Sequence, residues 1–204
     1  MAKSSKQWLQ RQNRDPFVKQ ARLSDYRSRA VFKLQEIDQK DRIFHPGQVV
    51  VDLGAAPGSW SQYAAQRTGP GGRVLAVDIL DMEPVSNVLF IKGDFTDPEI
   101  FQRCVADLQD QSVDLVISDL APNLSGIRNT DQARSMHLAE LVYDFSRQVL
   151  KADGAMLVKL FQGQGTDDYS HTLRQRFRKV VVRKPGASRD KSREFYILAR
   201  GYVV

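Results

Sequence analysis

Residues 50–60 read Val-Val-Asp-Leu-Gly-Ala-Ala-Pro-Gly-Ser-Trp, and this stretch predicts a strand, a tight turn and the start of a helix. The strand ends at Asp52, Gly54 forms the turn, and the helix begins at Ser59, directly after Gly58. A glycine-rich turn lets a ligand approach bare backbone, and open α/β sheets bind ligands at the carboxyl ends of their strands. The stretch therefore predicts both a fold class and a ligand site.

Further apolar, β-branched runs follow the first one, which covers Val49 to Asp52. They are Val74 to Val77, Val88 to Ile91, Val113 to Ile117 and Ala155 to Leu160. Segments of helical length or Gly/Pro turns separate them, including a periodic segment from about Asp131 to Leu150 that Asp153-Gly154 breaks. Continuous apolar strands that alternate with helices are typical of a parallel sheet covered on both faces. The sequence thus predicts an α/β fold.

The pattern changes after Leu160. A helix is expected around Asp167 to Phe177, followed by two strand-like runs, Lys179 to Arg183 and Glu194 to Ala199, which a polar loop joins. These runs predict a hairpin that gives the sheet an antiparallel edge. We expect residues 1–25 to form a basic N-terminal extension and residues 26–204 to form one domain.

Composition limits the class of protein. The chain has 204 residues, 42% of them hydrophobic, which suffices for one sizeable core. The single cysteine, Cys104, excludes an internal disulfide, and the three histidines lack metal-ligand spacing, so we expect no metal. The polar start and the lack of a long apolar run predict a cytoplasmic protein without membrane contact. With no long amphipathic seam unassigned, we expect a monomer.

Charge is distributed unevenly along the chain. The net charge of +6 divides into +6 for residues 1–40, −8 for residues 41–170 and +8 for residues 171–204. Two basic ends around an acidic middle indicate a polyanionic partner that the ends hold over a central site.

The spacing of the glycine turn narrows the choice of ligand. Dinucleotide enzymes use G-x-G-x-x-G to admit a pyrophosphate, whereas this chain has Gly54-x-x-x-Gly58 and an acid, Asp52, that would repel a phosphate. A ligand with an amine and a carboxylate fits better, and S-adenosylmethionine is such a ligand. Asp78 ends the second strand, where a carboxylate accepts ribose hydroxyls. Asp94 follows the third strand, where it can accept the adenine amino group while Phe95 flanks the ring.

The fourth strand ends in Ser118-Asp119-Leu120-Ala121-Pro122-Asn123, which places another acid at the same edge. Amino methyltransferases commonly carry an Asn- or Asp-Pro-Pro-aromatic motif here, whose aromatic side chain holds a base or an amine. In this chain Asn123 replaces that aromatic residue. The motif therefore argues against an exocyclic amine as methyl acceptor.

Five motifs in order resemble one known family. They are Tyr26 to Ile37 (YRSRAVFKLQEI), Val51 to Gln62 (VDLGAAPGSWSQ), Ser118 to Gly126 (SDLAPNLSG), Val158 to Gly163 (VKLFQG) and Arg183 to Glu194 (RKPGASRDKSRE). The chain resembles the FtsJ or RrmJ type of ribose 2′-O-methyltransferases over nearly its whole length, from about Trp8. The resemblance implies a Rossmann-like methyltransferase fold with a mostly parallel seven-stranded sheet. It also implies methyl transfer to the ribose 2′-hydroxyl of a uridine in the A loop of 23S rRNA, within the large ribosomal subunit.

The resemblance also implies roles for individual residues. The family's catalytic set falls on Lys33, Asp119, Lys159 and Glu194, and its cofactor contacts fall on Gly58, Trp60, Asp78, Asp94 and Asp119, beside the Gly54 turn. Ser59 departs from the second glycine that bacterial relatives often have, but serine is a competent helix cap. Leu23 to Tyr26 departs as well, which can alter local RNA contacts.

Two roles for Lys159 stay open from the sequence. In one it acts as a neutral base on the 2′-hydroxyl; in the other it stays charged and orients the hydroxyl while Asp119 or water takes the proton. We expect Glu194 to fix Lys159 and Lys33 to help place the target ribose.

Basic residues near both ends are the candidates for RNA binding. They are Arg27, Arg29, Lys184, Arg189, Lys191 and Arg193, and phosphate contacts suit their charge. Two other classes of function compete. The missing G-x-G-x-x-G argues against a nicotinamide oxidoreductase, and the intact catalytic set argues against a catalytically silent RNA-binding module.

Overall fold

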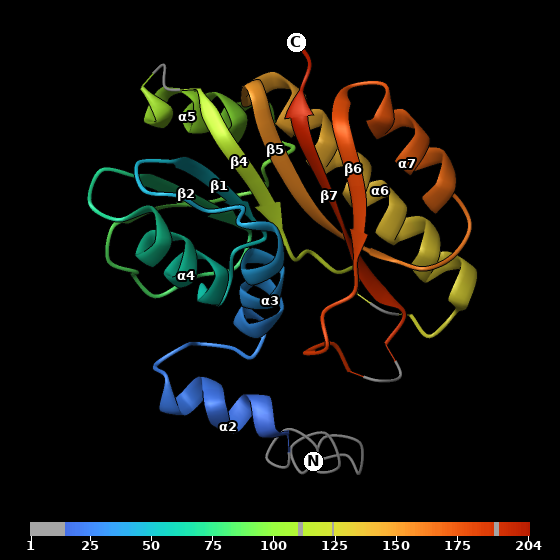
Figure 1. Cartoon of the computed structure of the whole chain (residues 1–204), viewed down its shortest axis with the longest axis horizontal. Helices are drawn as coiled ribbons and strands as arrows, with labels where there is room; N and C mark the ends of the chain where they lie inside the picture. Colours follow the sequence, from blue (N-terminus) through green and yellow to red (C-terminus); the bar gives the residue numbers. More distant parts are fainter. Residues whose placement is uncertain (1–14, 110–111, 124, 190–191) are drawn as a thin grey trace.

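The computed structural model describes residues 15–109, 112–123, 125–189 and 192–204 (Figure 1). Its elements run in the order α2 (Pro16–Leu23), α3 (Val31–Asp41), β1 (Val49–Leu53), α4 (Ser59–Thr68), β2 (Arg73–Asp78), β3 (Val88–Lys92), α5 (Pro98–Leu108), β4 (Val113–Ser118), α6 (Arg128–Val149), β5 (Leu150–Phe161), α7 (Thr166–Arg174), β6 (Phe177–Arg183) and β7 (Glu194–Tyr202).

The seven strands form one sheet in the order β3-β2-β1-β4-β5-β7-β6. The strands from β3 to β5 pair in parallel, and β7 runs antiparallel between β5 and β6. The prediction of a Rossmann-like methyltransferase sheet with an antiparallel edge is confirmed, and the reversed strand, β7, lies one place in from that edge. The strand order reverses between β1 and β4, and a ligand crevice is expected at such a point.

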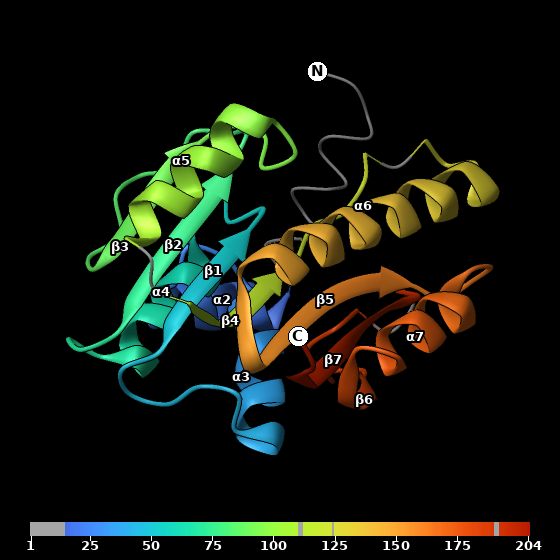
Figure 2. The same ribbon diagram turned by 90° about the horizontal axis from the view of Figure 1, so that it is seen from above.

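The core has one layer on each face of the sheet. Buried residues of α5, α6 and α7 form one hydrophobic cluster with the strands, and buried residues of α3 and α4 form the other. Figure 2 shows α5 and α6 on the side of the sheet opposite to α3. The strands between the layers are almost fully buried, which explains why they read as continuous apolar runs.

Three predicted boundaries are wrong. The long helix α6 begins at Arg128 and not at Asp131, and the strand β5 already begins at Leu150. The Asp153-Gly154 pair breaks no element, because Asp153 adopts a left-handed conformation and the strand continues past a shift in its register with β4. Phe177 belongs to β6 and not to α7, because its ring packs in the core against Tyr202.

The N-terminal segment packs onto α3. The rings of Phe17 in α2 and Phe32 in α3 lie 5.6 Å apart, and Ala21 is buried in the same cluster. Arg29 forms an ion pair with Asp15, directly before α2. The division at residue 25 stays a prediction. Across the described ranges, no helix has the length and apolar character to cross a membrane.

Candidate active site and cofactor site

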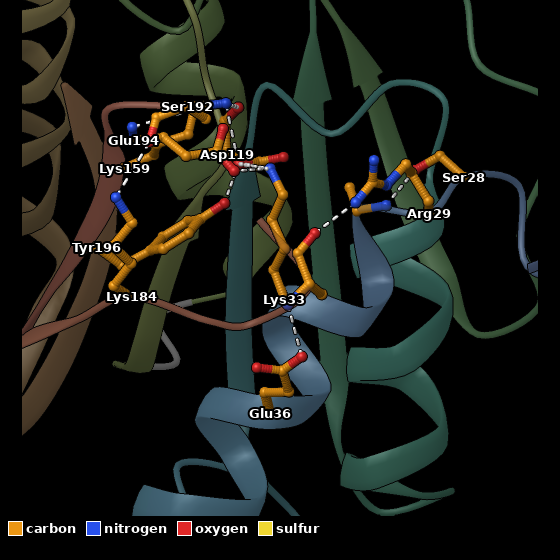
Figure 3. A network of polar contacts seen from close by, with 12 residues as sticks. Ser28, Arg29, Lys33, Glu36, Asp119, Lys159, Lys184, Ser192, Glu194 and Tyr196 are labelled. Atoms are coloured by element: carbon orange, nitrogen blue, oxygen red, sulfur yellow. Dashed lines mark hydrogen bonds and ion pairs between the residues drawn. The ribbon is translucent and has the colours of Figure 1, made fainter. Parts of the chain in front are cut away.

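Four charged residues from four elements meet at the carboxyl edge of the sheet (Figure 3). Lys33 comes from α3, Asp119 directly follows β4, Lys159 lies in β5, and Glu194 begins β7. Lys33 Nζ lies 2.7 Å from Glu194 Oε1, and Lys159 Nζ lies 2.9 Å from Asp119 Oδ1. Lys33 Nζ also lies 4.0 Å from Asp119 Oδ1, so the predicted catalytic set forms one cluster.

The register of β5 and β7 explains how the cluster assembles. Lys159 pairs with Tyr196 across the antiparallel ladder, so both side chains point to the face that α3 covers. Glu194 lies two residues before Tyr196 and points to the same face. Because β7 lies next to β5, the carboxylate of Glu194 lies near the end of β5. There it meets the ammonium of Lys33, which in turn lies near Asp119 at the end of β4.

One detail of the predicted cluster is wrong. The expected partner of Glu194 was Lys159, but Glu194 pairs with Lys33, and within the described residues no ion pair or hydrogen bond joins Glu194 to Lys159. The reason is that Lys159 turns toward Asp119, donating to its carboxylate and to its backbone carbonyl oxygen. Glu194 therefore holds Lys33 in place and not Lys159.

Tyr196 is a member of the cluster that sequence reasoning missed. Its hydroxyl donates to Asp119 Oδ1 at 2.6 Å, and Lys33 Nζ lies 5.9 Å from the centre of its ring. Burial, reinforced by the charges of Asp119 and Glu194, raises the pKa of Tyr196 well above its usual value, so the hydroxyl stays a donor. Its position two residues after Glu194 on a strand was the available signal.

The glycine turn after β1 is built as predicted. Gly54 and Gly58 both adopt positive φ values, of 76° and 104°. A Cβ at Gly54 would lie 2.2 Å from Leu120 Cδ2, and one at Gly58 would lie 2.8 Å from Met82 Sδ. A side chain at Gly54 would clash with Leu120 in the loop after β4, and one at Gly58 would clash with Met82 in the loop after β2, so the two glycines let the turn pack closely against both loops.

Asp78 supports this turn directly. Its carboxylate oxygens accept hydrogen bonds from the backbone N–H groups of Ala56 and Leu80, each at 2.8 Å. A carboxylate has about four acceptor positions, so it can still accept ribose hydroxyls. Asp94, after β3, accepts from the backbone and hydroxyl of Thr96 through Oδ1. The backbone N–H of Gly93 donates to the carbonyl of Asp78, which places the two acids at neighbouring strand ends.

The two predicted aromatic contacts have structural partners. Trp60 is buried, its indole N–H donates to the carbonyl of Ala30, and its ring lies 5.8 Å from that of Tyr196. Through Tyr196 it therefore joins α4 to the cluster of Lys33, Asp119, Lys159 and Glu194. The ring of Phe95 packs edge-on against Phe145 at 6.0 Å. The cofactor roles of both residues stay predictions.

Asp52 lies under the turn and is almost fully buried. Burial, reinforced by the nearby charges of Asp119 and Asp78, raises its pKa to about 7 against the opposing effect of a 2.6 Å hydrogen bond from the Ser61 hydroxyl. The negative charge of the site thus rises as the pH passes neutrality.

The predicted RNA-binding residues fall into two groups. Arg27 donates to the carbonyl oxygens of Pro57, Glu83 and Pro84, and Arg29 donates to Asp15 and to the carbonyl of Ala187. These guanidinium groups connect loops around the site. Lys184, Arg189 and Arg193 lie on or beside the loop between β6 and β7, whereas Lys191 and the basic residues before residue 15 lie outside the described residues. All six stay predictions as RNA contacts.

Among the described residues, no group of three or more His, Cys, Asp or Glu side chains is arranged to hold a metal ion.

Comparison with known proteins decides the family. A model of the FtsJ-like methyltransferase family matches residues 26–202. The chain belongs to this family. This chain is 53% identical over 203 residues to "Ribosomal RNA large subunit methyltransferase E" from Marinobacter nauticus, a match that covers 100% of this chain and 98% of the relative. It is 52% identical over 201 residues to the protein of the same name from Pseudomonas aeruginosa, covering 98% and 97% of the two chains.

A solved structure extends the comparison. A Plasmodium falciparum protein described as a ribosomal RNA methyltransferase superposes with a TM-score of 0.79 at 29% identity, covering 87% of this chain and 98% of the other. The resemblance found from the five motifs is confirmed at the level of the family. As a member of a methyltransferase family, the chain requires a methyl donor.

Proposed function

We propose that this FtsJ-like methyltransferase transfers a methyl group from S-adenosylmethionine to the ribose 2′-hydroxyl of one uridine in the A loop of 23S rRNA. The observation that carries the proposal is the cluster of Lys33, Asp119, Lys159, Glu194 and Tyr196 beside the glycine turn. The relatives named for the large subunit support rRNA as the substrate, and we propose the large ribosomal subunit as its context.

The residues around the turn suit S-adenosylmethionine. Gly54 and Gly58 allow the positive φ values of the turn, and the carboxylates of Asp78 and Asp94 lie at neighbouring strand ends, where they can accept from a ribose and an adenine. When bound, this cofactor supplies a methyl group on a positively charged sulfur, which leaves as a neutral thioether as the new C–O bond forms.

The geometry favours a charged Lys159. A lysine ammonium has three N–H donors, and two acceptors on Asp119 can take two of them. The third donor is left to orient the ribose oxygen, which positions the nucleophile for in-line attack. Lys33 and Glu194 form a second ion pair beside it and fix the edge of the site next to α3.

Asp119 is the group placed to accept the proton. Its Oδ1 is shared by Lys159 and Tyr196, whereas its Oδ2 accepts no hydrogen bond from any described residue. As the C–O bond forms, the ribose oxygen becomes positively charged and its proton strongly acidic, so a carboxylate suffices as the base. The proton then passes from the ribose oxygen to Asp119 or, through it, to water.

Methyl transfer to defined RNAs tests this function. The protein should transfer label from S-adenosylmethionine to the 23S rRNA of large subunits isolated from cells that lack the activity. Small subunits serve as the matched RNA control and should stay unlabelled. No transfer to large subunits, or equal transfer to both, would contradict the proposal.

A further inference from the structure

A second cavity lies between the start of α6, the turn after β5 and Arg193. It has a volume of about 540 Å³, and its wall includes Arg128, Asn129 and Gln132 from the first turns of α6, Gly163 and Gln164 from the turn after β5, and Arg193. We call it the α6 pocket. Its volume falls in the range of small-ligand sites.

The α6 pocket lies at the same carboxyl edge of the sheet as the proposed active site, on the face that α6 covers (Figure 2). Arg193 directly precedes Glu194, and the backbone N–H of Gln162 donates to the carbonyl of Arg193 at 2.9 Å. The helix α6 begins at Arg128, in the segment that follows Asp119, at the same carboxyl edge of the sheet. A polymer whose one nucleotide reaches Lys159 can thus place a neighbouring nucleotide in the pocket.

The positive charge of the α6 pocket favours an anion as its ligand. Its lining contains two arginines and no acidic residue. Within the described part of the chain, neither Arg128 nor Arg193 takes part in an ion pair, and the one hydrogen bond of the Arg193 side chain is a long one, 3.4 Å, to the carbonyl of Gln162. Both guanidinium groups therefore keep donors for a ligand.

The start of α6 adds backbone donors. Its cap residue, Ile127, provides no side-chain hydrogen bond, and the one acid of the first turn, Asp131, is taken up by the backbone N–H groups of Ser125 and Gly126 and the Ser125 hydroxyl. These bonds lower the pKa of Asp131 and keep it charged within the 125–131 turn. The free N–H groups at the start of a helix favour a phosphate.

A buried amide on the pocket wall points to a ligand independently of the charge. Gln132 is only 7% exposed, and its Nε2 donates to the carbonyl of Gln164, but its Oε1 has no partner among the described residues. An unsatisfied buried acceptor is costly. Gly163 leaves room for this amide, because a Cβ there would lie 2.6 Å from Gln132 Cδ.

We propose that the α6 pocket binds a phosphate-bearing nucleotide of the RNA next to the methylated one. The inference rests on the proposed RNA substrate and assigns it a second contact point. The phosphate lies between Arg128 and Arg193 at the start of α6, and a donor on the nucleotide reaches the Gln132 amide. S-adenosylmethionine has no phosphate, so the pocket serves the substrate and not the cofactor.

Two variants test the α6 pocket. Arg128→Ala removes one phosphate donor and should raise the KM for large subunits about tenfold, reduce the salt slope of RNA binding by about 1, and leave the affinity for S-adenosylmethionine unchanged. Asn129→Asp adds a negative charge with almost no change of shape. It should weaken RNA binding as well, while the stability of the protein stays equal or rises, because an acid near a helix start is favourable.

Arg147→Ala is the matched control, because it removes the same charge from the exposed last turn of the same helix. It should bind and methylate large subunits like the wild type. If Arg128→Ala and Asn129→Asp equal this control while the wild type is active, the pocket assignment is wrong and the proposed function stands. If the wild type fails to methylate large subunits at all, the proposed function itself is wrong.

Discussion

At the scale of single residues, Asp119 organises the proposed active site. One of its carboxylate oxygens lies 2.6 Å from the Tyr196 hydroxyl and 2.9 Å from Lys159 Nζ, and Lys33 Nζ lies 4.0 Å away. All three groups carry or donate protons, which keeps the carboxylate in place.

Lys159→Ala should separate catalysis from cofactor binding. Removal of the ammonium leaves the ribose oxygen without its orienting donor, so turnover should fall by about a hundredfold or more. The affinity for S-adenosylmethionine, measured by calorimetry, should stay within about twofold, because Lys159 contacts Asp119 and not the Gly54 turn. Equal losses in turnover and cofactor affinity would contradict the catalytic role.

Asp52 should make stability depend on pH. Its pKa of about 7 in the folded state lies above the usual value of 3.8, so the folded chain holds a proton that the unfolded chain has lost. This contribution to stability is fully present below pH 4 and is lost as the pH rises toward and past 7. It amounts to at most about 4 kcal/mol.

Asp52→Asn keeps an acceptor for the Ser61 hydroxyl but cannot ionise. The free energy of unfolding of this variant, measured by urea titration, should therefore fall less between pH 5 and pH 8 than that of the wild type. Parallel pH profiles for the two proteins would show that Asp52 does not titrate in this range.

At the scale of elements, Glu36 attaches the basic loop between β6 and β7 to α3. Its two carboxylate oxygens accept the backbone N–H groups of Gly186 at 2.6 Å and Ala187 at 2.8 Å. Arg29 adds a hydrogen bond to the carbonyl of Ala187. Because α3 also carries Lys33, the loop and the proposed catalytic cluster share one support.

Glu36→Ala should release this loop. Two backbone donors lose a charged acceptor, so trypsin should cleave after Arg189, which is exposed, several times faster than in the wild type. Glu83→Ala, which removes an exposed carboxylate far along the chain, is the control and should not change the rate. An unchanged cleavage rate in Glu36→Ala would mean that other contacts hold the loop.

The elements that the sequence predicted well are those with a single physical cause. The central strands are buried on both faces, so their apolar runs marked them, and the glycine turn needs positive φ values at Gly54 and Gly58. The strand β5 escaped prediction at its start because Asp153-Gly154 resembles a turn. Asp153 does adopt a left-handed conformation, but Leu150 and Ala155 on either side of the pair both pair with β4. At this point the pairing between β4 and β5 outweighed the local preference of Asp153-Gly154 for a turn.

Side-chain pairing within the site was harder to predict. The five motifs placed the charged residues at one sheet edge, but the pairing of Glu194 with Lys33 depends on where α3 docks against β7. The spacing of two residues between Glu194 and Tyr196 shows that both side chains point to one face of the strand, but nothing in the sequence shows where α3 docks or that Tyr196 contacts Asp119. The same holds for the α6 pocket, whose lining comes from three segments.

At the scale of the whole molecule, the acidic and basic parts of the sequence occupy different places around the carboxyl edge of the sheet. The acidic middle of the chain contributes Asp78, Asp94 and Asp119 at the carboxyl edge of the sheet, and the basic C-terminal part contributes the loop beside them. We infer that the RNA lies across this edge with its phosphates against the basic loop.

Salt should therefore act on the two substrates differently. The affinity for RNA, measured by filter binding between 50 and 300 mM KCl, should fall steeply, because each phosphate contact releases counterions. The affinity for S-adenosylmethionine, measured over the same range, should change little. An RNA affinity that is independent of salt would contradict phosphate binding by the basic loop.

The central claim is that the methyl group goes to a ribose oxygen. It is tested most directly by digesting methylated 23S rRNA to nucleosides and identifying the labelled one by mass spectrometry. The account predicts that the labelled nucleoside is 2′-O-methyluridine, from one position in the A loop, and that Lys159→Ala yields none. Label on a uracil, cytosine, adenine or guanine base would contradict it.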